Sequence, residues 1–206
     1  MCTRYTLCMN YEPRSFTIPP LPGISEKTMS EHLGLYQGYV KNFNALSDLL
    51  REYGADSTKH AHALSELMRR RSFEFDGMRL HELYFTQLEE GTKPLLPTSD
   101  LAVALSREYG TLPSFITIFK AIGLMRGPGW ALLYWDPAAQ QFLTGFSGEQ
   151  HQGHLVTLPI ILALDVWEHA FILDHGAQGK AAYIDAFFAS LNWNVIEARY
   201  SHALKA

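Results

Sequence analysis

The sequence contains only two cysteines, Cys2 and Cys8, among 206 residues. Small secreted scaffolds depend on several disulfides, so this class of protein is excluded and a reducing compartment is favoured. Basic residues are also scarce: 17 Lys and Arg stand against 21 Asp and Glu, which gives a net charge of −4. A nucleic-acid partner is therefore not expected, because the chain has no basic surplus to attract phosphates.

Long hydrophobic runs are missing as well. The longest apolar stretch, residues 155–167, is interrupted by Thr157, Pro159 and Asp165 and is far shorter than the roughly 20 residues that a membrane span needs. Residues 1–10 contain no apolar segment of the kind that signal peptides carry. Apolar residues still make up 47% of the chain, enough to bury a core. The sequence predicts a cytoplasmic protein that does not contact membranes.

Helical periodicity dominates the first half of the sequence. Residues 1–23, which include four prolines, are predicted to form an extended arm. Ser25 is a typical N-cap residue, and apolar residues then recur at three- and four-residue steps to about Tyr53, which predicts one long amphipathic helix. Two further helices are predicted at about 56–70 and 76–90.

The pattern changes after residues 91–97, where two prolines forbid a continuous helix. This segment divides the predicted domains, 1–93 and 94–206. The second domain is predicted to contain helices at 99–109, 113–124, 180–191 and 195–203 and strands at 130–135, 141–146 and 158–164. The fold class is therefore α+β. A long antiparallel helical hairpin lobe precedes a lobe with a small three-stranded antiparallel sheet flanked by helices.

Asp165 and His169 are a candidate metal-binding pair, because residues four apart can face one point. Imidazole nitrogen and carboxylate oxygen together suit iron, manganese or zinc. By itself the pair is better explained by a buried aspartate that caps a helix and a hydrogen-bonded core histidine. However, His32 and His81 lie on apolar stripes of two separate predicted helices. The four residues together would form a three-histidine, one-aspartate site between the two lobes, with a coordination position left open.

Several segments of the chain resemble the iron/manganese superoxide dismutase family, over about residues 19–200. The most specific is D-V-W-E-H-A at 165–170. The others are L-P-G-I-S-E-K-T-M-S-E-H at 21–32, Y-V-K-N-F-N at 39–44, G-P-G-W at 127–130 and L-N-W at 191–193. The resemblance implies the fold described above and conversion of superoxide to oxygen and hydrogen peroxide by a metal that cycles between +3 and +2. It also implies one Mn or Fe ion per subunit and a homodimer or tetramer.

The resemblance also implies roles for individual residues. The metal ligands would be His32, His81, Asp165 and His169. Tyr39 and Gln150 would be the catalytic residues, Trp130 and Trp167 would keep the metal cavity dry, and Glu168 would cross a dimer interface to the partner's metal-binding histidine. Gln150 occupies the position from which manganese-type members supply an outer-sphere side chain. Iron-type members supply that side chain from another position, which is Gly77 in this chain. This difference favours manganese.

The chain also departs from the family pattern. His32 and Tyr39 are separated by seven residues, one fewer than usual, yet seven helical steps of about 100° still leave them on one face. The family's interface histidine is absent from residues 35–37, and Ile172 replaces the tyrosine with which it pairs. Lys180 stands where the family has a steering arginine.

These departures leave two other functions open. One is a non-catalytic or weakly active metal-binding protein of the same fold that has lost the interface relay. The other is a metal-dependent hydrolase that uses the same ligands. If the first helix were shifted by one residue, Glu31 could also take the place of its neighbour His32 as a ligand.

The remaining histidines and the cysteines have simpler interpretations. His60 and His62 are predicted on a solvated helix. His151 and His154 flank a glycine-containing turn, where surface exposure is favoured over a second metal site. Cys2 and Cys8 are expected to stay reduced on the N-terminal arm.

Overall fold

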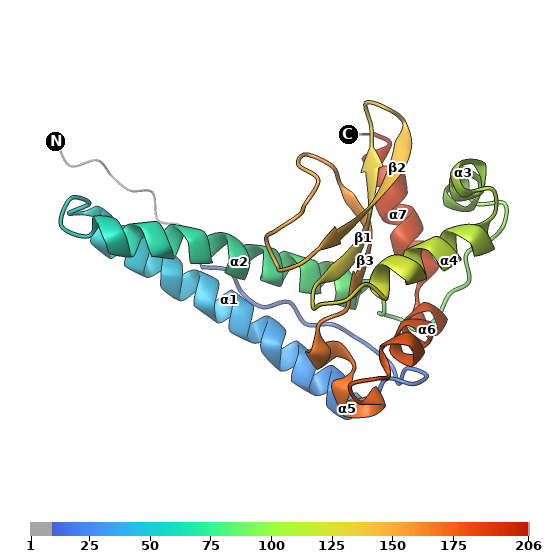
Figure 1. Ribbon diagram of the computed structural model, residues 1–206, viewed down its shortest axis with the longest axis horizontal. Helices are drawn as coiled ribbons and strands as arrows, with labels where there is room; N and C mark the ends of the chain where they lie inside the picture. The colour runs from blue at the N-terminus through green and yellow to red at the C-terminus, as the bar shows by residue number, and fades with distance from the viewer. Residues whose placement is uncertain (1–9, 206) are drawn as a thin grey trace.

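The computed structural model describes residues 10–205, so Cys2 and Cys8 lie outside the described residues. Residues 10–20 form neither helix nor strand, and an isolated bridge joins Leu21 to Ile24. This arm follows the helical hairpin (Figure 1), to which it is tied by main-chain hydrogen bonds. The Tyr11 N–H donates to Asn44 Oδ1 at 2.9 Å, and the Arg14 N–H donates to the Tyr36 hydroxyl at 2.9 Å. The predicted extended arm is therefore present in its described part.

Two long helices form the hairpin. Helix α1 spans Glu26–Gly54, and Ser25 caps it by accepting a hydrogen bond from the Thr28 N–H at 3.1 Å. Helix α2 spans Ala61–Thr86 and runs back beside α1 (Figure 1). The long first helix and its N-cap were predicted from the sequence, and both are confirmed.

The prediction of two separate helices at 56–70 and 76–90 was wrong, because a single helix, α2, covers most of both ranges without a break. Residues 55–60 form turns instead. Residues 70–76 contain neither proline nor glycine to break the helix. An ion pair one helical turn apart spans the expected gap, with Arg70 Nε 2.7 Å from Glu74 Oε1. The same guanidinium lies 4.0 Å from the centre of the Phe73 ring.

The second half of the chain contains a small sheet surrounded by helices (Figure 1). Helices α3 (Asp100–Tyr109) and α4 (Leu112–Gly123) precede the sheet, and η1 (Glu168–Ala170), α5 (Ile172–His175), α6 (Lys180–Ser190) and α7 (Trp193–Ala203) follow it. Strands β1 (Trp130–Asp136), β2 (Gln141–Ser147) and β3 (Ile160–Asp165) pair antiparallel in the order β2–β1–β3. The predicted α+β fold is confirmed; the short η1 and α5 were not predicted.

The sheet register brings distant residues to one end of the sheet. Trp130, the first residue of β1, pairs with Ser147 at the end of β2 and with Asp165 at the end of β3. The hairpin is joined to this sheet by the buried Gln87, whose amide exchanges hydrogen bonds with the main chain of Ala163. The hairpin helices are thereby fixed next to Asp165. Within residues 10–205, no helix is long and apolar enough to cross a membrane.

Candidate metal centre

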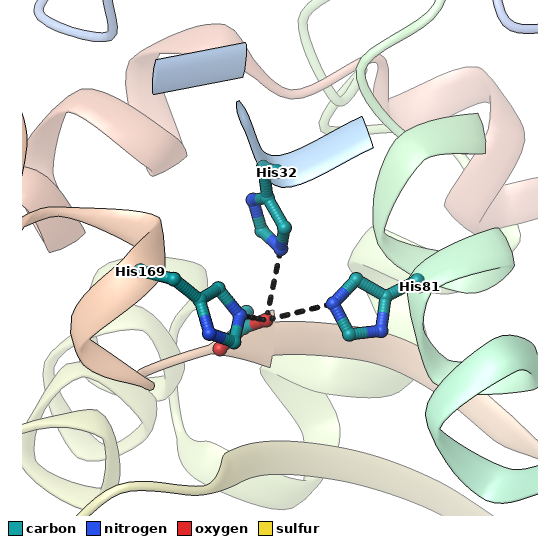
Figure 2. Close-up of side chains that lie close together, drawn as sticks. His32, His81 and His169 are labelled. Carbon is teal, nitrogen blue, oxygen red and sulfur yellow. Dashed lines mark hydrogen bonds and ion pairs between the residues drawn. The ribbon is translucent and has the colours of Figure 1, made fainter. Parts of the chain in front are cut away.

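Four side chains from four different elements converge on one point. His32 comes from α1, His81 from α2, Asp165 from the end of β3 and His169 from η1. One potential ligand atom from each lies within 4.8 Å of the other three. Figure 2 shows the imidazoles of His32, His81 and His169 directed at one point. That point is Asp165 Oδ2: Nε2 of His32 and of His169 lies 3.1 Å from it, and Nε2 of His81 lies 3.6 Å from it.

Local hydrogen bonds fix the aspartate and the turn that follows it. The Trp167 N–H donates to Asp165 Oδ1 at 2.8 Å, which folds the chain back after β3 and brings His169 to the carboxylate. The Tyr183 hydroxyl donates to the Asp165 main-chain oxygen at 2.8 Å, so its contact with the Tyr84 hydroxyl at 3.2 Å has Tyr84 as the donor. The sequence analysis missed both tyrosines, because no local pattern relates positions 84, 165 and 183.

The tautomer of His81 makes the cluster suitable for a cation. Its Nδ1 lies 2.6 Å from the Gly77 carbonyl oxygen, which can only accept, so the proton of a neutral His81 is on Nδ1. Burial lowers the pKa of His81 to about 3, which keeps the ring neutral. Its Nε2 is buried, has no hydrogen-bond partner and directs a lone pair at a carboxylate oxygen 3.6 Å away. Two electron-rich atoms facing each other are stabilised by a cation between them.

The spacing of these atoms also fits a metal ion. Ligand atoms about 2.1 Å from one ion are separated by about 3.0–3.6 Å when the angles between them are 90–120°. The three nitrogen–oxygen distances of 3.1, 3.1 and 3.6 Å lie in this range. Three imidazoles and one carboxylate form a donor set that suits iron, manganese or zinc.

Burial and mutual interactions shift the pKa values of Asp165, His32 and His169. Burial opposes ionisation of this carboxyl, but His169 and His32 outweigh burial and hold its pKa well below the usual range. Burial lowers the pKa of His32, although Asp165 opposes the shift. At His169 burial also acts to lower the pKa, but the Asp165 carboxylate prevails and raises it. The His32 and Asp165 side chains are about 1% and 0% exposed, whereas that of His169 is 21% exposed.

Tyr39, Gln150 and Trp130 form a hydrogen-bonded chain beside this cluster. The Trp130 indole N–H donates to Gln150 Oε1 at 2.8 Å, and Gln150 Nε2 donates to the Tyr39 hydroxyl at 3.0 Å. The Tyr39 ring lies 5.0 Å from the His81 ring, centre to centre. Because its oxygen accepts from Gln150, the Tyr39 hydroxyl still has a proton to donate, and burial raises its pKa.

Gly77 provides the space for Tyr39. A Cβ at this position would lie 2.5 Å from Tyr39 Cδ1 and 2.6 Å from its Cε1, well inside van der Waals contact. The face of α2 next to the site is therefore already filled by the phenol ring.

The other residues singled out from the sequence lie around the cluster. Trp167 stacks on His169 with 6.1 Å between ring centres, and its neighbour Glu168 is exposed. The Lys180 ammonium donates to the main-chain oxygens of Met125 and Gly127, at 2.8 and 3.1 Å. Ile172 is 42% exposed, and its hydrocarbon side chain has no atom that could hydrogen-bond to a histidine.

His151 and His154 are partly buried, so the surface exposure preferred for them was wrong. Among the described residues, the four-residue cluster is the only group of three or more such side chains close enough to hold a metal, which argues against a second site at this pair.

Comparison with known proteins identifies the family of the chain. The family model described as iron/manganese superoxide dismutases, C-terminal domain, matches residues 97–199. A superoxide dismutase [Fe] of Cupriavidus metallidurans is 32% identical over 202 residues, which cover 96% of this chain and 100% of the relative. The chain belongs to the iron/manganese superoxide dismutase family.

Other family members show the same degree of similarity. A superoxide dismutase [Fe] of Aquifex pyrophilus is 31% identical, with 95% of this chain and 93% of the relative covered. Superoxide dismutase [Mn] 2 of Haloferax volcanii is also 31% identical, with coverage of 89% and 90%. Both metals thus occur in the names of relatives, and the site of this family member is assigned to iron or manganese as a class.

Proposed function

We propose that this protein is a superoxide dismutase whose metal ligands are His32, His81, Asp165 and His169. The observation that supports this proposal most strongly is the orphaned, buried Nε2 of His81, which faces the Asp165 carboxylate at 3.6 Å. Membership of the iron/manganese superoxide dismutase family supports the same function.

The reaction consumes two superoxide anions and two protons and yields one oxygen and one hydrogen peroxide. An iron or manganese ion held by these ligands would supply a one-electron couple between its +3 and +2 states, so that one superoxide is oxidised and the other reduced. Three neutral imidazoles and one carboxylate contribute a single negative charge, so the loaded site stays positive and attracts the anionic substrate despite the net charge of −4.

The protein's own groups supply proton transfer and exclude water. Tyr39 has a free hydroxyl proton next to His81 and is held by Gln150, so we assign these two residues to the relay that brings protons to the reduced substrate. Trp130 holds the far end of Gln150 and, with Trp167, forms the apolar wall of the cavity. Such surrounding groups set the potential and the proton affinity of a metal site.

The alternative of a non-catalytic metal-binding protein is not favoured. The interface relay is missing, since Leu35 and Ile172 are exposed apolar residues, 43% and 42% exposed. However, the relay within the subunit is complete from Trp130 to Tyr39, and the relatives are named as superoxide dismutases.

A superoxide assay on protein whose metal has been identified by elemental analysis tests the function. We expect metal-dependent activity that falls in Tyr39→Phe, while the metal content of that variant matches the wild type. His62→Leu is a suitable control, because His62 is exposed on α2. Wild-type protein fully loaded with iron or with manganese that shows no activity above the free ion would refute the proposal.

We further propose manganese as the working metal. Gln150 reaches the site from the loop after β2, and Gly77 has no room for a side chain because Tyr39 fills that space. In the family resemblance this combination is the manganese-type arrangement. Metal-free protein reconstituted separately with each ion tests this proposal: the manganese form should be the more active, and a more active iron form would overturn it.

We also propose that the protein forms a homodimer or tetramer through the surface around Glu168. Glu168 is exposed beside His169, whose side chain is the only one of the four cluster side chains with substantial exposure, at 21%. A second subunit here would cover His169 and place Glu168 against the partner's metal-binding histidine. Light scattering with size-exclusion chromatography should give a dimer or larger, and Glu168→Ala should shift it toward monomer. A wild-type monomer would refute this proposal.

Two predictions from the sequence remain proposals. We place the domain division at residues 93/94, with the metal site between the two domains, and limited proteolysis in the 91–97 segment would test it. We place the protein in the cytoplasm because it has only two cysteines; cell fractionation would test this location.

A further inference from the structure

The loop that carries Gln150 has no regular secondary structure. It leaves β2 at Ser147 and enters β3 at Ile160, and residues 148–159 form neither helix nor strand. Yet the Gln150 side chain is completely buried and connects Trp130 to Tyr39. The position of the Gln150 side chain therefore depends on hydrogen bonds that other side chains make to the loop.

His154 is bonded through both ring nitrogens to this loop and to the sheet. Its Nε2 lies 2.7 Å from the Gln150 main-chain oxygen, and its Nδ1 lies 3.1 Å from the Tyr134 hydroxyl. A carbonyl oxygen only accepts, so Nε2 carries the proton and donates it to Gln150. Nδ1 of the neutral ring then accepts the hydroxyl proton of Tyr134, which is on β1 and only 1% exposed.

The direction of each hydrogen bond in the chain is thus determined. Tyr134 donates to His154, His154 donates to the Gln150 main chain, and the Gln150 side chain donates to Tyr39. The rigid strand β1 is linked in this way to the Tyr39 hydroxyl through two residues of an irregular loop. Strand β1 also supplies Trp130, which holds the other end of the same Gln150 amide.

We propose that His154 is a positioning residue that sets the location of Gln150 by holding its main-chain oxygen. The proposal rests on the function proposed above, in which Gln150 and Tyr39 relay protons. His154 does not touch the metal cluster; it acts through Gln150. A metal-binding role for His154 is disfavoured, because Nε2 carries a proton and the one basic lone pair of the ring, on Nδ1, accepts from Tyr134.

Ser147 cannot replace this contact. Its hydroxyl lies 2.6 Å from the main-chain oxygens of Glu149 and Gln152, one residue before and two residues after Gln150. The hydroxyl has one proton and donates to one of these two oxygens at a time, which shapes the turn, but the Gln150 carbonyl itself is bonded to His154. Loss of His154 should therefore let residue 150 rotate while the turn persists.

The test compares His154→Leu with His154→Gln. Leucine removes both hydrogen bonds, whereas a glutamine amide N–H can take the place of Nε2–H. His62→Leu is the matched control, since it makes the same replacement on the exposed surface of α2. A second variant, Tyr134→Phe, removes the hydroxyl that orients the imidazole and that also meets the Leu155 main chain, and it tests the same link if His154→Leu fails to fold.

The first readout is independent of activity. The Trp130 indole N–H signal in NMR spectra of metal-free protein, assigned with Trp130→Phe, reports the hydrogen bond to Gln150. We expect this signal to move in His154→Leu and, to a smaller degree, in Tyr134→Phe. It should return toward the wild-type position in His154→Gln.

The second readout is dismutase activity per bound metal. Because residues that orient functional groups around a metal typically contribute 10- to 100-fold, we expect a loss of about that size in His154→Leu at unchanged metal content. His154→Gln should recover most of the activity. An unmoved Trp130 signal with wild-type activity in His154→Leu would overturn the proposal, as would equal losses in the leucine and glutamine variants. If loaded wild-type protein has no dismutase activity, the proposed function fails, and the Trp130 signal still decides whether His154 positions Gln150.

Discussion

Gly77→Ala is the substitution for which the structure gives the sharpest expectation, because it adds one methyl group against a residue of the proposed proton relay. The new Cβ would lie 2.5 Å from Tyr39 Cδ1, 2.6 Å from Cε1 and 3.0 Å from Cγ. Carbon atoms in favourable contact lie about 3.5 Å apart or more. The phenol ring must therefore move by about 1 Å, away from its present position between Gln150 and the His81 ring.

The stability change combines two opposing effects. Overpacking of a filled site costs about 1–3 kcal/mol, and replacement of glycine by alanine inside a helix returns about 1 kcal/mol. The net loss should be about 0–2 kcal/mol, which lowers the melting temperature by at most roughly 8 °C in a chain of this size. Activity should fall much further, by as much as about 100-fold, because a displacement of 1 Å disrupts a geometry-dependent step.

The assay measures dismutase activity, metal content and melting temperature on the same preparations. The metal content should match the wild type, because the Gly77 carbonyl that orients His81 is retained. Gly38→Ala in α1 is the matched control: a Cβ there meets nothing within 4 Å, so it should raise stability by up to about 1 kcal/mol and leave Tyr39 in place. Gly77→Ala protein as active as wild type would refute the reasoning.

Three further outcomes are expected. His81→Ala should lose bound metal, measured by elemental analysis after dialysis, and full retention would contradict its role as a ligand. Arg199→Leu should lower the free energy of unfolding by about 3 kcal/mol without changing the ligands, because the buried guanidinium bonds to α2 and β3; denaturant titration would show this loss, and an unchanged midpoint would contradict it. Metal-free protein should lose stability as the pH falls from about 6.5 towards 3. In this range the unfolded chain takes up a proton at His81, whereas the folded chain, in which burial lowers the pKa of His81 to about 3, does not. The raised pKa of His169 acts in the opposite direction, but mainly above about pH 6.5, where the folded chain holds a proton that the unfolded chain has lost. Acid titration monitored by circular dichroism measures the effect, and a flat profile would contradict it.

Local sequence patterns determined most of the secondary structure. Ser25 and the apolar residues that recur after it sufficed to predict α1, because capping and periodicity act within a few residues. The strands at 130–135 and 141–146 were predicted for the same reason. The break expected near residue 73 was wrong because an interaction one helical turn apart, between Arg70 and Glu74, supports a segment with weak apolar periodicity.

The residue types of the candidate site could be chosen from sequence, but their arrangement could not. Asp165 and His169 are four residues apart, so local spacing already suggested a pair. His32 and His81 join them only because α1 and α2 form a hairpin that packs on β3. The direction of the His81 lone pair depends on the Gly77 carbonyl in the folded helix. The hydrogen bond from Tyr183 to the Asp165 main chain joins residues that are 18 positions apart in the sequence.

The sequence by itself determined the helices and strands and the chemistry available in their side chains. Only the tertiary structure decided which side chains meet. It brought His154, for which the sequence had suggested a surface position, into hydrogen-bond contact with the Gln150 main chain. It also filled the space beside Gly77 with the ring of Tyr39. The physical reason is that hydrogen-bond direction and packing distance depend on atoms that are neighbours in space but far apart along the chain.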